Sequence, residues 1–117
     1  NDRFGHATGD ALLREVAQRL ENGVRRSDVV GRWGGEEFAI LFPDTLLEEA
    51  HVVMERLRAS IALDPSLRGD EWPVTFSCGI APVRSFAHLE NATRNADGAL
   101  YAAKNGGRNR VQISKDE

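Results

Sequence analysis

The sequence has very little of what extracellular, membrane-spanning or nucleic-acid-binding domains depend on. Its one cysteine, Cys78, lies in an apolar segment, so no disulfide can form within the chain, and the residue fits a small core position in a reducing compartment. No apolar run approaches the roughly 18 to 20 residues that a membrane span requires, and no signal-peptide pattern is present. Basic residues number 15 against 18 acidic ones, which argues against a surface for DNA or RNA.

We therefore expect a cytoplasmic domain that makes no membrane contact of its own, with any phosphate site confined to one place. A chain of 117 residues, 41% hydrophobic and 28% charged, fits one soluble domain over residues 1–117. The chain begins at Asn1 without an initiator Met, so we expect a longer natural protein, which upstream segments can anchor to a membrane. No internal repeat or low-complexity segment is present.

Hydrophobic periodicity predicts a first helix over about 10–22, ended by Gly23. Two apolar strands, 29–33 and 38–42, flank a Gly-Gly-Glu-Glu segment and predict a hairpin. The second strand, 38–42, is apolar without alternation, so we expect both of its faces to be covered near the centre of a sheet.

Thr45 and Glu48 form a capping-box pattern that predicts a second helix. Its apolar stripe comprises Leu46, Leu47, Ala50, Val53, Met54, Leu57 and Ile61. A charged loop with Pro and Gly, 64–73, precedes a predicted strand over 74–83. A third helix over 89–104 and a short strand over 110–114 complete an α/β sheet covered by helices.

Three clusters have residue types that suit phosphate and metal chemistry. The first is Arg32-Trp33-Gly34-Gly35-Glu36-Glu37-Phe38. Two glycines at a hairpin tip let backbone amides approach a bulky anion, and two carboxylates can hold a divalent metal. A tight turn flanked by solvated acids gives the same pattern.

The second cluster, Asn1 to Asp10, precedes the first helix. Asn and Asp side chains can recognise the hydrogen-bonding edge of a guanine, although Asp10 also suits a simple helix N-cap. In the third cluster, Lys104 and Arg108 flank the Gly106-Gly107 turn. They can contact phosphate oxygens together, or serve only as favourable cations at a helix C-terminus.

Together the strings NDRFGHATGD, RWGGEEF and ADGALYAAKNGGRN resemble the GGDEF domain, the bacterial diguanylate cyclase module, in order and spacing. The resemblance runs from the first residue to about Val111. It implies a fold similar to nucleotidyl cyclases and polymerase palms, with a central, mainly antiparallel sheet flanked by helices. It also implies an enzyme that condenses two GTP into cyclic di-GMP with release of pyrophosphate.

The resemblance further implies a role for each matching residue. Glu36 would hold Mg²⁺ or Mn²⁺ and help deprotonate the ribose 3′-hydroxyl, with Glu37 assisting at the metal. Gly34 and Gly35 would pass beside the GTP phosphates. The remaining substrate contacts would be Asn1 and Asp10 to guanine, and Lys104 and Arg108 to the β- and γ-phosphates. Because each domain binds one GTP, catalysis would need a homodimer.

Arg25 and Asp28 form an RxxD pattern that five residues separate from Gly34. This pattern resembles the inhibitory site for cyclic di-GMP in the family. Arg56, on the second helix, would add a contact from a neighbouring domain, although a solvated arginine also explains it.

The sequence departs from the family at its start, because the strand with an Asp-x-Asp pattern that family members have before this segment is absent. We therefore expect an N-terminally incomplete domain, with little or no cyclase activity from these 117 residues alone. The alternative is a catalytically inactive GGDEF domain that serves as a cyclic di-GMP receptor through Arg25 and Asp28. The intact Glu36, Glu37, Lys104 and Arg108 argue against that alternative.

Overall fold

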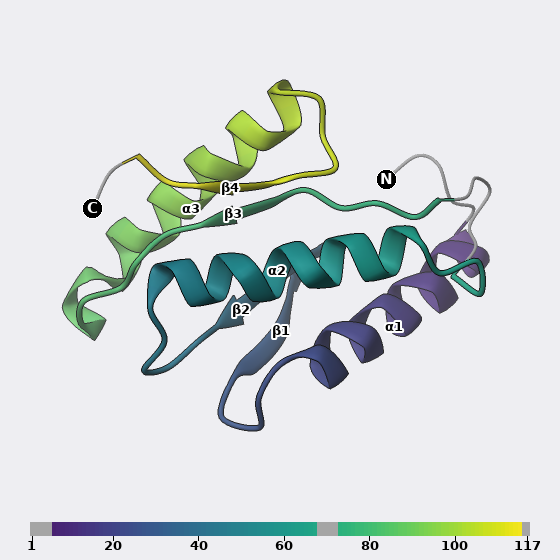
Figure 1. Ribbon diagram of the computed structural model, residues 1–117, viewed down its shortest axis with the longest axis horizontal. Coiled ribbons are helices and arrows are strands. Elements are labelled where there is room, and N and C mark those ends of the chain that lie inside the picture. The colour runs from purple at the N-terminus through teal and green to yellow at the C-terminus, as the bar shows by residue number, and fades with distance from the viewer. Residues whose placement is uncertain (1–5, 68–72, 116–117) are drawn as a thin grey trace. The chain divides into compact units, whose positions relative to one another are not determined.

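The chain alternates helices with short strands, as the computed structural model shows for residues 6–67 and 73–115 (Figure 1). Along the chain the elements are α1 His6–Gly23, β1 Val29–Gly34, β2 Glu37–Leu41, α2 Leu47–Ala62, β3 Cys78–Ile80, the 3₁₀ turn η1 Phe86–His88, α3 Leu89–Asn105 and β4 Val111–Ile113. The mixed α/β class expected from the sequence is confirmed. Among the residues described, no helix is both long and apolar enough to cross a membrane.

The elements form two compact units, each with its own two-stranded sheet. The first unit comprises Asn1–Thr45 and Ala59–Val74, and contains α1, β1 and β2. The second comprises Leu46–Arg58 and Thr75–Glu117, and contains β3, η1, α3 and β4. The dividing point at residues 58 and 59 falls inside α2, so that helix contributes residues to both.

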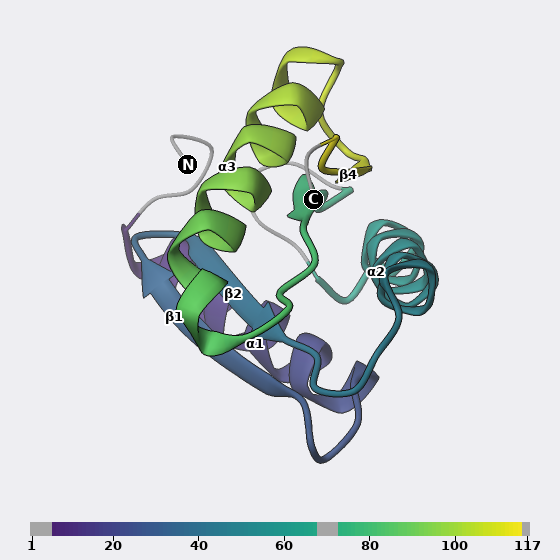
Figure 2. The same cartoon turned by 90° about the vertical axis from the view of Figure 1, so that its left-hand side faces the viewer.

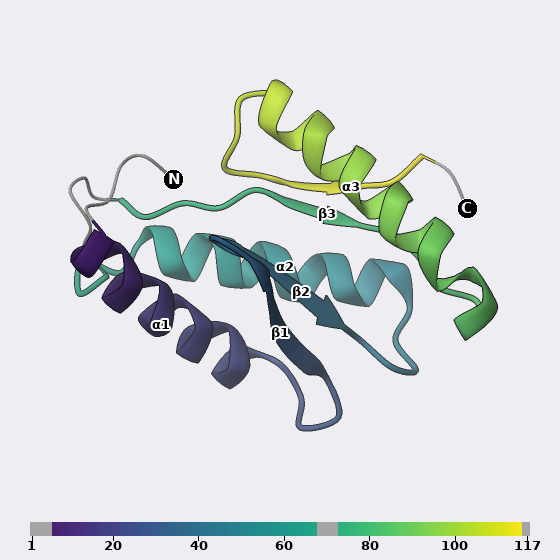
Figure 3. The same cartoon turned by 180° about the vertical axis from the view of Figure 1, so that it is seen from behind.

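In the first unit, α1 lies beside the β1–β2 hairpin (Figure 3). Leu12, Val16 and Leu20 recur at helical spacing and are all buried, which confirms the apolar stripe predicted for this helix. The helix begins at His6, four residues before the expected start at Asp10. Helix boundaries are poorly marked by periodicity when the first residues are small or polar, as they are here.

The β1–β2 pair is antiparallel, and its register aligns Val30 with Ile40 and Arg32 with Phe38. The predicted hairpin is therefore confirmed. The expectation that β2 lies near a sheet centre is not met among the residues described, because β2 pairs with β1 alone and its last residue, Leu41, is 40% exposed. An apolar strand sequence indicates that the strand favours burial, but it does not specify which strands pair with it.

An ion pair joins α1 to the turn that follows α2 in the first unit. The Arg19 guanidinium donates to the Asp64 carboxylate, and Ser66 donates to the same carboxylate from its hydroxyl at 2.7 Å and its backbone N–H at 2.9 Å. These hydrogen bonds from Ser66 and Arg19 lower the pKa of Asp64 to about 2. Leu67 closes the turn as one of the most deeply buried side chains in the residues described.

In the second unit, α3 packs against β3 and β4, which pair in parallel (Figure 2). Ala92, Ala99 and Ala103 of α3 are buried. These small residues allow the backbones of α3 and β3 to approach closely, and the approach is clearest at Gly79 of β3. A Cβ on Gly79 would lie 2.2 Å from the Ala96 carbonyl oxygen and 2.4 Å from the Leu100 nitrogen.

Two local predictions are wrong. Among the residues described, the strand predicted over 74–83 pairs only at Cys78–Ile80, with the three residues of β4. The capping box of Thr45 and Glu48 does not form: the Leu46 N–H donates to Glu49 Oε1 at 2.9 Å instead, one residue further along. Because α2 begins at Leu47, Leu46 and not Thr45 directly precedes the helix, and the Thr45 hydroxyl instead donates to the Pro43 carbonyl and accepts from Arg25.

Gly79→Ala should destabilise the protein by about 3 kcal/mol or more, because the new methyl group would overlap backbone atoms of α3 that cannot move aside. Urea unfolding measures the change in the free energy of unfolding. The matched control is Gly98→Ala, on α3 itself with open space around it. That change should stabilise by about 0.5 to 1 kcal/mol through helix propensity. Equal effects of the two changes would contradict the close approach of β3 to α3.

Candidate functional site

The tip of the β1–β2 hairpin is a two-residue turn made by Gly35 and Glu36. Gly34 and Glu37 pair across it, and the register shifts between Arg32 and Gly34. Gly35 has φ +46°, in the left-handed region that glycine adopts without strain. A positive φ at the first central residue is typical of a type II′ turn, whose twist matches that of the strands. Gly35 therefore allows a tight, exposed turn in which Glu36 has the one side chain.

Arg32 ties this tip to its own strand. Its Nε donates to the Gly35 carbonyl oxygen at 2.9 Å, and Nη2 donates to the same oxygen. Because the peptide bond is trans, a carbonyl held toward Arg32 directs the following N–H, that of Glu36, to the opposite side. The contact therefore fixes the orientation of the peptide group between Gly35 and Glu36.

Glu36 and Glu37 are both exposed at the tip. Glu36 lies in the turn itself, and strand alternation places Glu37, the first residue of β2, on the face opposite Phe38. Among the residues described, no group of three or more Asp, Glu, His or Cys side chains is gathered as a metal cage would be. The hairpin therefore supplies a pair of carboxylates and no larger acidic cluster.

Asp10 lies within α1 and is exposed. Because the helix already begins at His6, the interpretation of Asp10 as an N-cap is wrong. Asn1, the other predicted guanine contact, lies outside the described residues.

A shallow hollow lies between α1 and the hairpin in the first unit. It is lined by Leu13, Arg14, Ala17, Glu21, Val30, Gly31, Arg32 and Phe38. None of the predicted substrate or metal residues lines it. The candidate site therefore consists of exposed groups at element ends, and the hollow adds only Arg32 to it.

Lys104 and Arg108 lie at the C-terminal end of α3 in the second unit, on either side of the Gly106-Gly107 turn as the sequence predicts. Both are exposed. The Arg108 N–H donates to the Ala103 carbonyl at 2.9 Å and closes the helix. Arg108 has φ +62° and Asn109 has φ +49°, which for a non-glycine residue costs about 1 kcal/mol or more.

This strained turn is held by a side chain from α2 of the same unit. Arg58 Nη1 donates to Asn109 Oδ1 at 2.9 Å, while Arg58 Nε pairs with Glu55 at 2.5 Å. The two contacts fix the guanidinium at both ends. The backbone turn that carries Arg108 is therefore fastened to α2 by Arg58.

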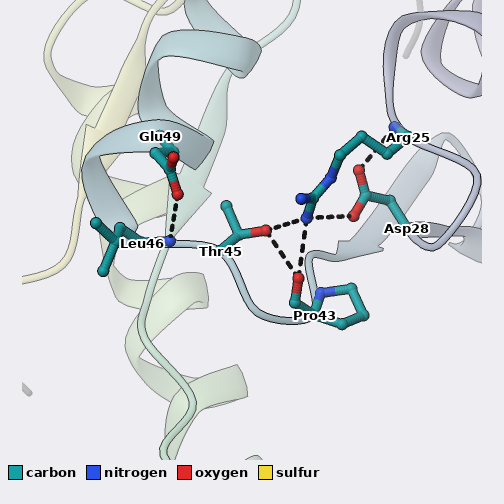
Figure 4. A network of polar contacts seen from close by, with 6 residues as sticks. All are labelled: Arg25, Asp28, Pro43, Thr45, Leu46 and Glu49. Atoms are coloured by element: carbon teal, nitrogen blue, oxygen red, sulfur yellow. Dashed lines mark hydrogen bonds and ion pairs between the residues drawn. The ribbon is translucent and has the colours of Figure 1, made fainter.

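Arg25 and Asp28, the RxxD pair, contact each other directly (Figure 4). The Arg25 backbone N–H donates to Asp28 Oδ2 at 2.8 Å, and its Nη2 lies 3.3 Å from Asp28 Oδ1. Nη2 also donates to the Pro43 carbonyl at 2.9 Å and to the Thr45 hydroxyl. The predicted contact residue Arg56 is exposed on α2.

Three residues of these contacts had no predicted role: Arg32, Arg58 and Asn109. Thr45 had only the role of a helix cap. In the sequence each of these residues is only an arginine or a short polar residue close to a motif. Spacing alone does not distinguish such a residue from an ordinary solvated side chain. For Arg32 the position three residues before Gly35 was the strongest clue.

Cys78, in β3, is the one nucleophilic thiol of the chain, and it is unsuited to catalysis. Burial raises the pKa of this thiol to about 12, and the charge of Glu55 adds to the shift. The thiol is therefore protonated at neutral pH, when a nucleophile would need to be thiolate. This agrees with the small packing residue expected from the sequence.

The arrangement of helices and strands matches that of solved GGDEF domains. The GGDEF domain of DgcB from Caulobacter crescentus, in complex with c-di-GMP, superposes with a TM-score of 0.85 at 32% identity, over 99% of this chain and 70% of that one. The active GGEEF domain of a diguanylate cyclase from Vibrio cholerae gives 0.84 at 31% identity, over 100% and 75%. The protein therefore has the palm-like α/β fold of these domains.

Sequence comparison gives the same result. Residues 1–110 match the family model for "Diguanylate cyclase, GGDEF domain". The chain is 41% identical to the diguanylate cyclase DgcP of Pseudomonas aeruginosa over 115 residues, and 42% identical to DgcM of Escherichia coli over 111 residues. These matches cover 97% and 95% of this chain, but only 17% and 27% of the relatives. The chain belongs to the GGDEF domain family.

Cys78 in the native protein should react with a thiol reagent at pH 8 at least about 100-fold more slowly than in the urea-unfolded chain. With a pKa near 12, about one thiol in 10⁴ is ionised at that pH, against about a quarter for an ordinary cysteine. The measurement is the rate of alkylation with and without urea, with free cysteine in each buffer as the control. Similar rates in the two states would show that Cys78 is neither buried nor protonated as described.

Proposed function

We propose that this domain is the catalytic module of a diguanylate cyclase, which joins two GTP into cyclic di-GMP. The observation that carries the proposal is the hairpin tip, where Gly34 and Gly35 are followed directly in the sequence by Glu36, in the turn, and Glu37, the first residue of β2. The relatives named diguanylate cyclases support it. The GGEEF domain from Vibrio cholerae, described as active, shares the glutamate form of the motif.

A divalent metal fits the donor set at this tip. Mg²⁺ is usually held by one or two carboxylates together with substrate phosphates and water, and Glu36 and Glu37 are the carboxylates that would hold it here. Mn²⁺ accepts the same oxygen ligands. When bound, the metal would neutralise phosphate charge and lower the pKa of the attacking ribose hydroxyl.

The residues of the chain would act around that chemistry. Gly34 and Gly35 leave room for the triphosphate, and the Glu36 carboxylate accepts the proton of the ribose 3′-hydroxyl. The 3′-oxygen then bonds to the α-phosphorus of the second GTP, the bond to its β-phosphate breaks, and pyrophosphate leaves. Repetition of the step in the opposite direction closes the ring.

Further residues would contact the substrate. Asp10, with Asn1, would recognise guanine through a carboxylate that helix capping does not require. Lys104 and Arg108 would bind the β- and γ-phosphates, and the strained backbone at Arg108 supports a functional placement of that residue. Because each domain binds one GTP and the product has two-fold symmetry, two copies of the domain would face each other as a homodimer.

Arg25 and Asp28 would bind the cyclic di-GMP product and inhibit the enzyme, with Arg56 adding a contact from a neighbouring domain. The DgcB GGDEF domain was solved with c-di-GMP, which supports product binding by a domain of this fold. We propose one such domain over residues 1–117, and since the chain covers between 17% and 33% of the first curated relatives, the activity belongs to the full-length protein.

Glu36→Gln in the full-length protein should lower the rate of cyclic di-GMP formation by about 100-fold or more, because the charge is lost while the shape is kept. Turnover of GTP with Mg²⁺ is followed by chromatography of the product and by pyrophosphate release. Glu15→Gln, the same chemical change on the exposed side of α1, is the control and should retain the parental rate.

Circular dichroism should give the same spectrum for the parent and both variants. A Glu36→Gln enzyme with parental rates would refute the role of Glu36. A parent that binds GTP and forms no cyclic di-GMP would refute the proposed activity.

A further inference from the structure

The inference concerns the Arg25 guanidinium in the first unit, and it rests on the proposed product site. Among the residues described, the side-chain hydrogen bonds of Arg25 are all made by one nitrogen, Nη2 (Figure 4). Its acceptors are the Asp28 carboxylate at 3.3 Å, the Pro43 carbonyl at 2.9 Å and the Thr45 hydroxyl. Nη2 carries two hydrogens, so three acceptors already compete for them.

A guanidinium binds a planar acceptor pair through one of two edges, Nε with Nη2 or Nη1 with Nη2. Nη2 belongs to both edges. A phosphate or the acceptor edge of a guanine therefore cannot form a bidentate contact with Arg25 while both hydrogens of Nη2 stay on protein acceptors. When such a ligand binds, it takes one of the two Nη2 hydrogens, so a single hydrogen is left for the Asp28, Pro43 and Thr45 oxygens and the competition among them increases.

The contact best able to open is that with Thr45. The Asp28 side chain is only 2% exposed, and its carboxylate also accepts the Arg25 backbone N–H at 2.8 Å, so it is fixed and charged. The Pro43 carbonyl is part of the backbone. The Thr45 hydroxyl is a neutral acceptor that also donates to Pro43 at 2.9 Å, and that bond remains when Arg25 leaves.

The backbone between these acceptors keeps them together. Asp44 has φ +50°, which an Asp tolerates better than most residues, and Pro43 and Thr45 on either side of it direct their oxygens to the same nitrogen. This turn therefore presents a built acceptor pair to Arg25 in the free domain.

We propose that Thr45 competes with cyclic di-GMP for Nη2 of Arg25, and thereby sets the affinity of the product site. The residue acts through Arg25 and needs no contact with the ligand. In the free domain the Thr45 hydroxyl accepts a hydrogen bond from the Arg25 guanidinium. That hydrogen bond breaks when the ligand binds. Removal of the hydroxyl therefore tightens product binding.

The test is Thr45→Val, which keeps the β-branched shape and loses the hydroxyl. The full-length variant should bind cyclic di-GMP about 3- to 10-fold more tightly by titration calorimetry, the range expected for one net hydrogen bond. The product concentration that halves turnover should fall by the same factor, while kcat and KM for GTP at low product stay parental.

Two variants make the result specific. Thr45→Ser keeps the hydroxyl and should restore the parental affinity. Thr45→Ala also removes the hydroxyl and should tighten binding in the same direction if Thr45→Val fails to fold. Unchanged or weaker binding by both hydroxyl-free variants, or a serine variant that behaves like valine, would overturn the competition.

Arg25→Ala separates this inference from the proposed product site. Loss of cyclic di-GMP binding in Arg25→Ala, together with parental binding in Thr45→Val, would overturn the competition and leave the product site standing. Equal binding by the parent and Arg25→Ala would overturn both the product site and the competition at it.

Discussion

The register of the β1–β2 hairpin is the constraint on which the first unit depends. Gly34 and Glu37 pair across a two-residue turn, and the shift between Arg32 and Gly34 leaves Trp33 as an extra residue on one strand. Since side chains alternate along a strand, a slip of one residue would exchange the faces of Phe38 and Glu37. The turn thus decides both which side chains lie beside α1 and which carboxylates stand at the tip.

In the second unit, close packing has the equivalent role. Gly79 lets β3 approach the backbone of α3, and the buried alanines of α3 complete the contact. This fixes the helix, and with it the C-terminal turn that carries Lys104 and Arg108. That turn contains two successive residues with left-handed backbone conformation, which are strained. The packing of α3 and the contact from Arg58 stabilise the turn in this conformation.

Three arginines share one structural role in loops that would otherwise have few fixed contacts. Arg25 fastens the loop before β1 to the loop after β2, Arg32 fastens the hairpin tip, and Arg58 fastens the turn after α3. Each guanidinium bonds to an oxygen of a turn, where backbone groups lack ladder partners. The loops that contain the family motifs are therefore ordered by charge-assisted hydrogen bonds more than by burial.

The helices, the hairpin and the motif residues can be predicted from the amino-acid sequence, because they depend on local spacing. Leu12, Val16 and Leu20 show a helical face at any position in a fold, and Gly34-Gly35 favours a tight turn wherever it lies. The ends of β3, the cap of α2 and the partners of Arg25 and Thr45 could not be predicted in this way and are known from the folded chain. The extent of a strand depends on its partner, and β3 pairs with β4 over three residues. Arg25 bonds to acceptors 18 and 20 residues away in the sequence. Its side chain is long and flexible, so its partners depend on which groups folding brings close to it.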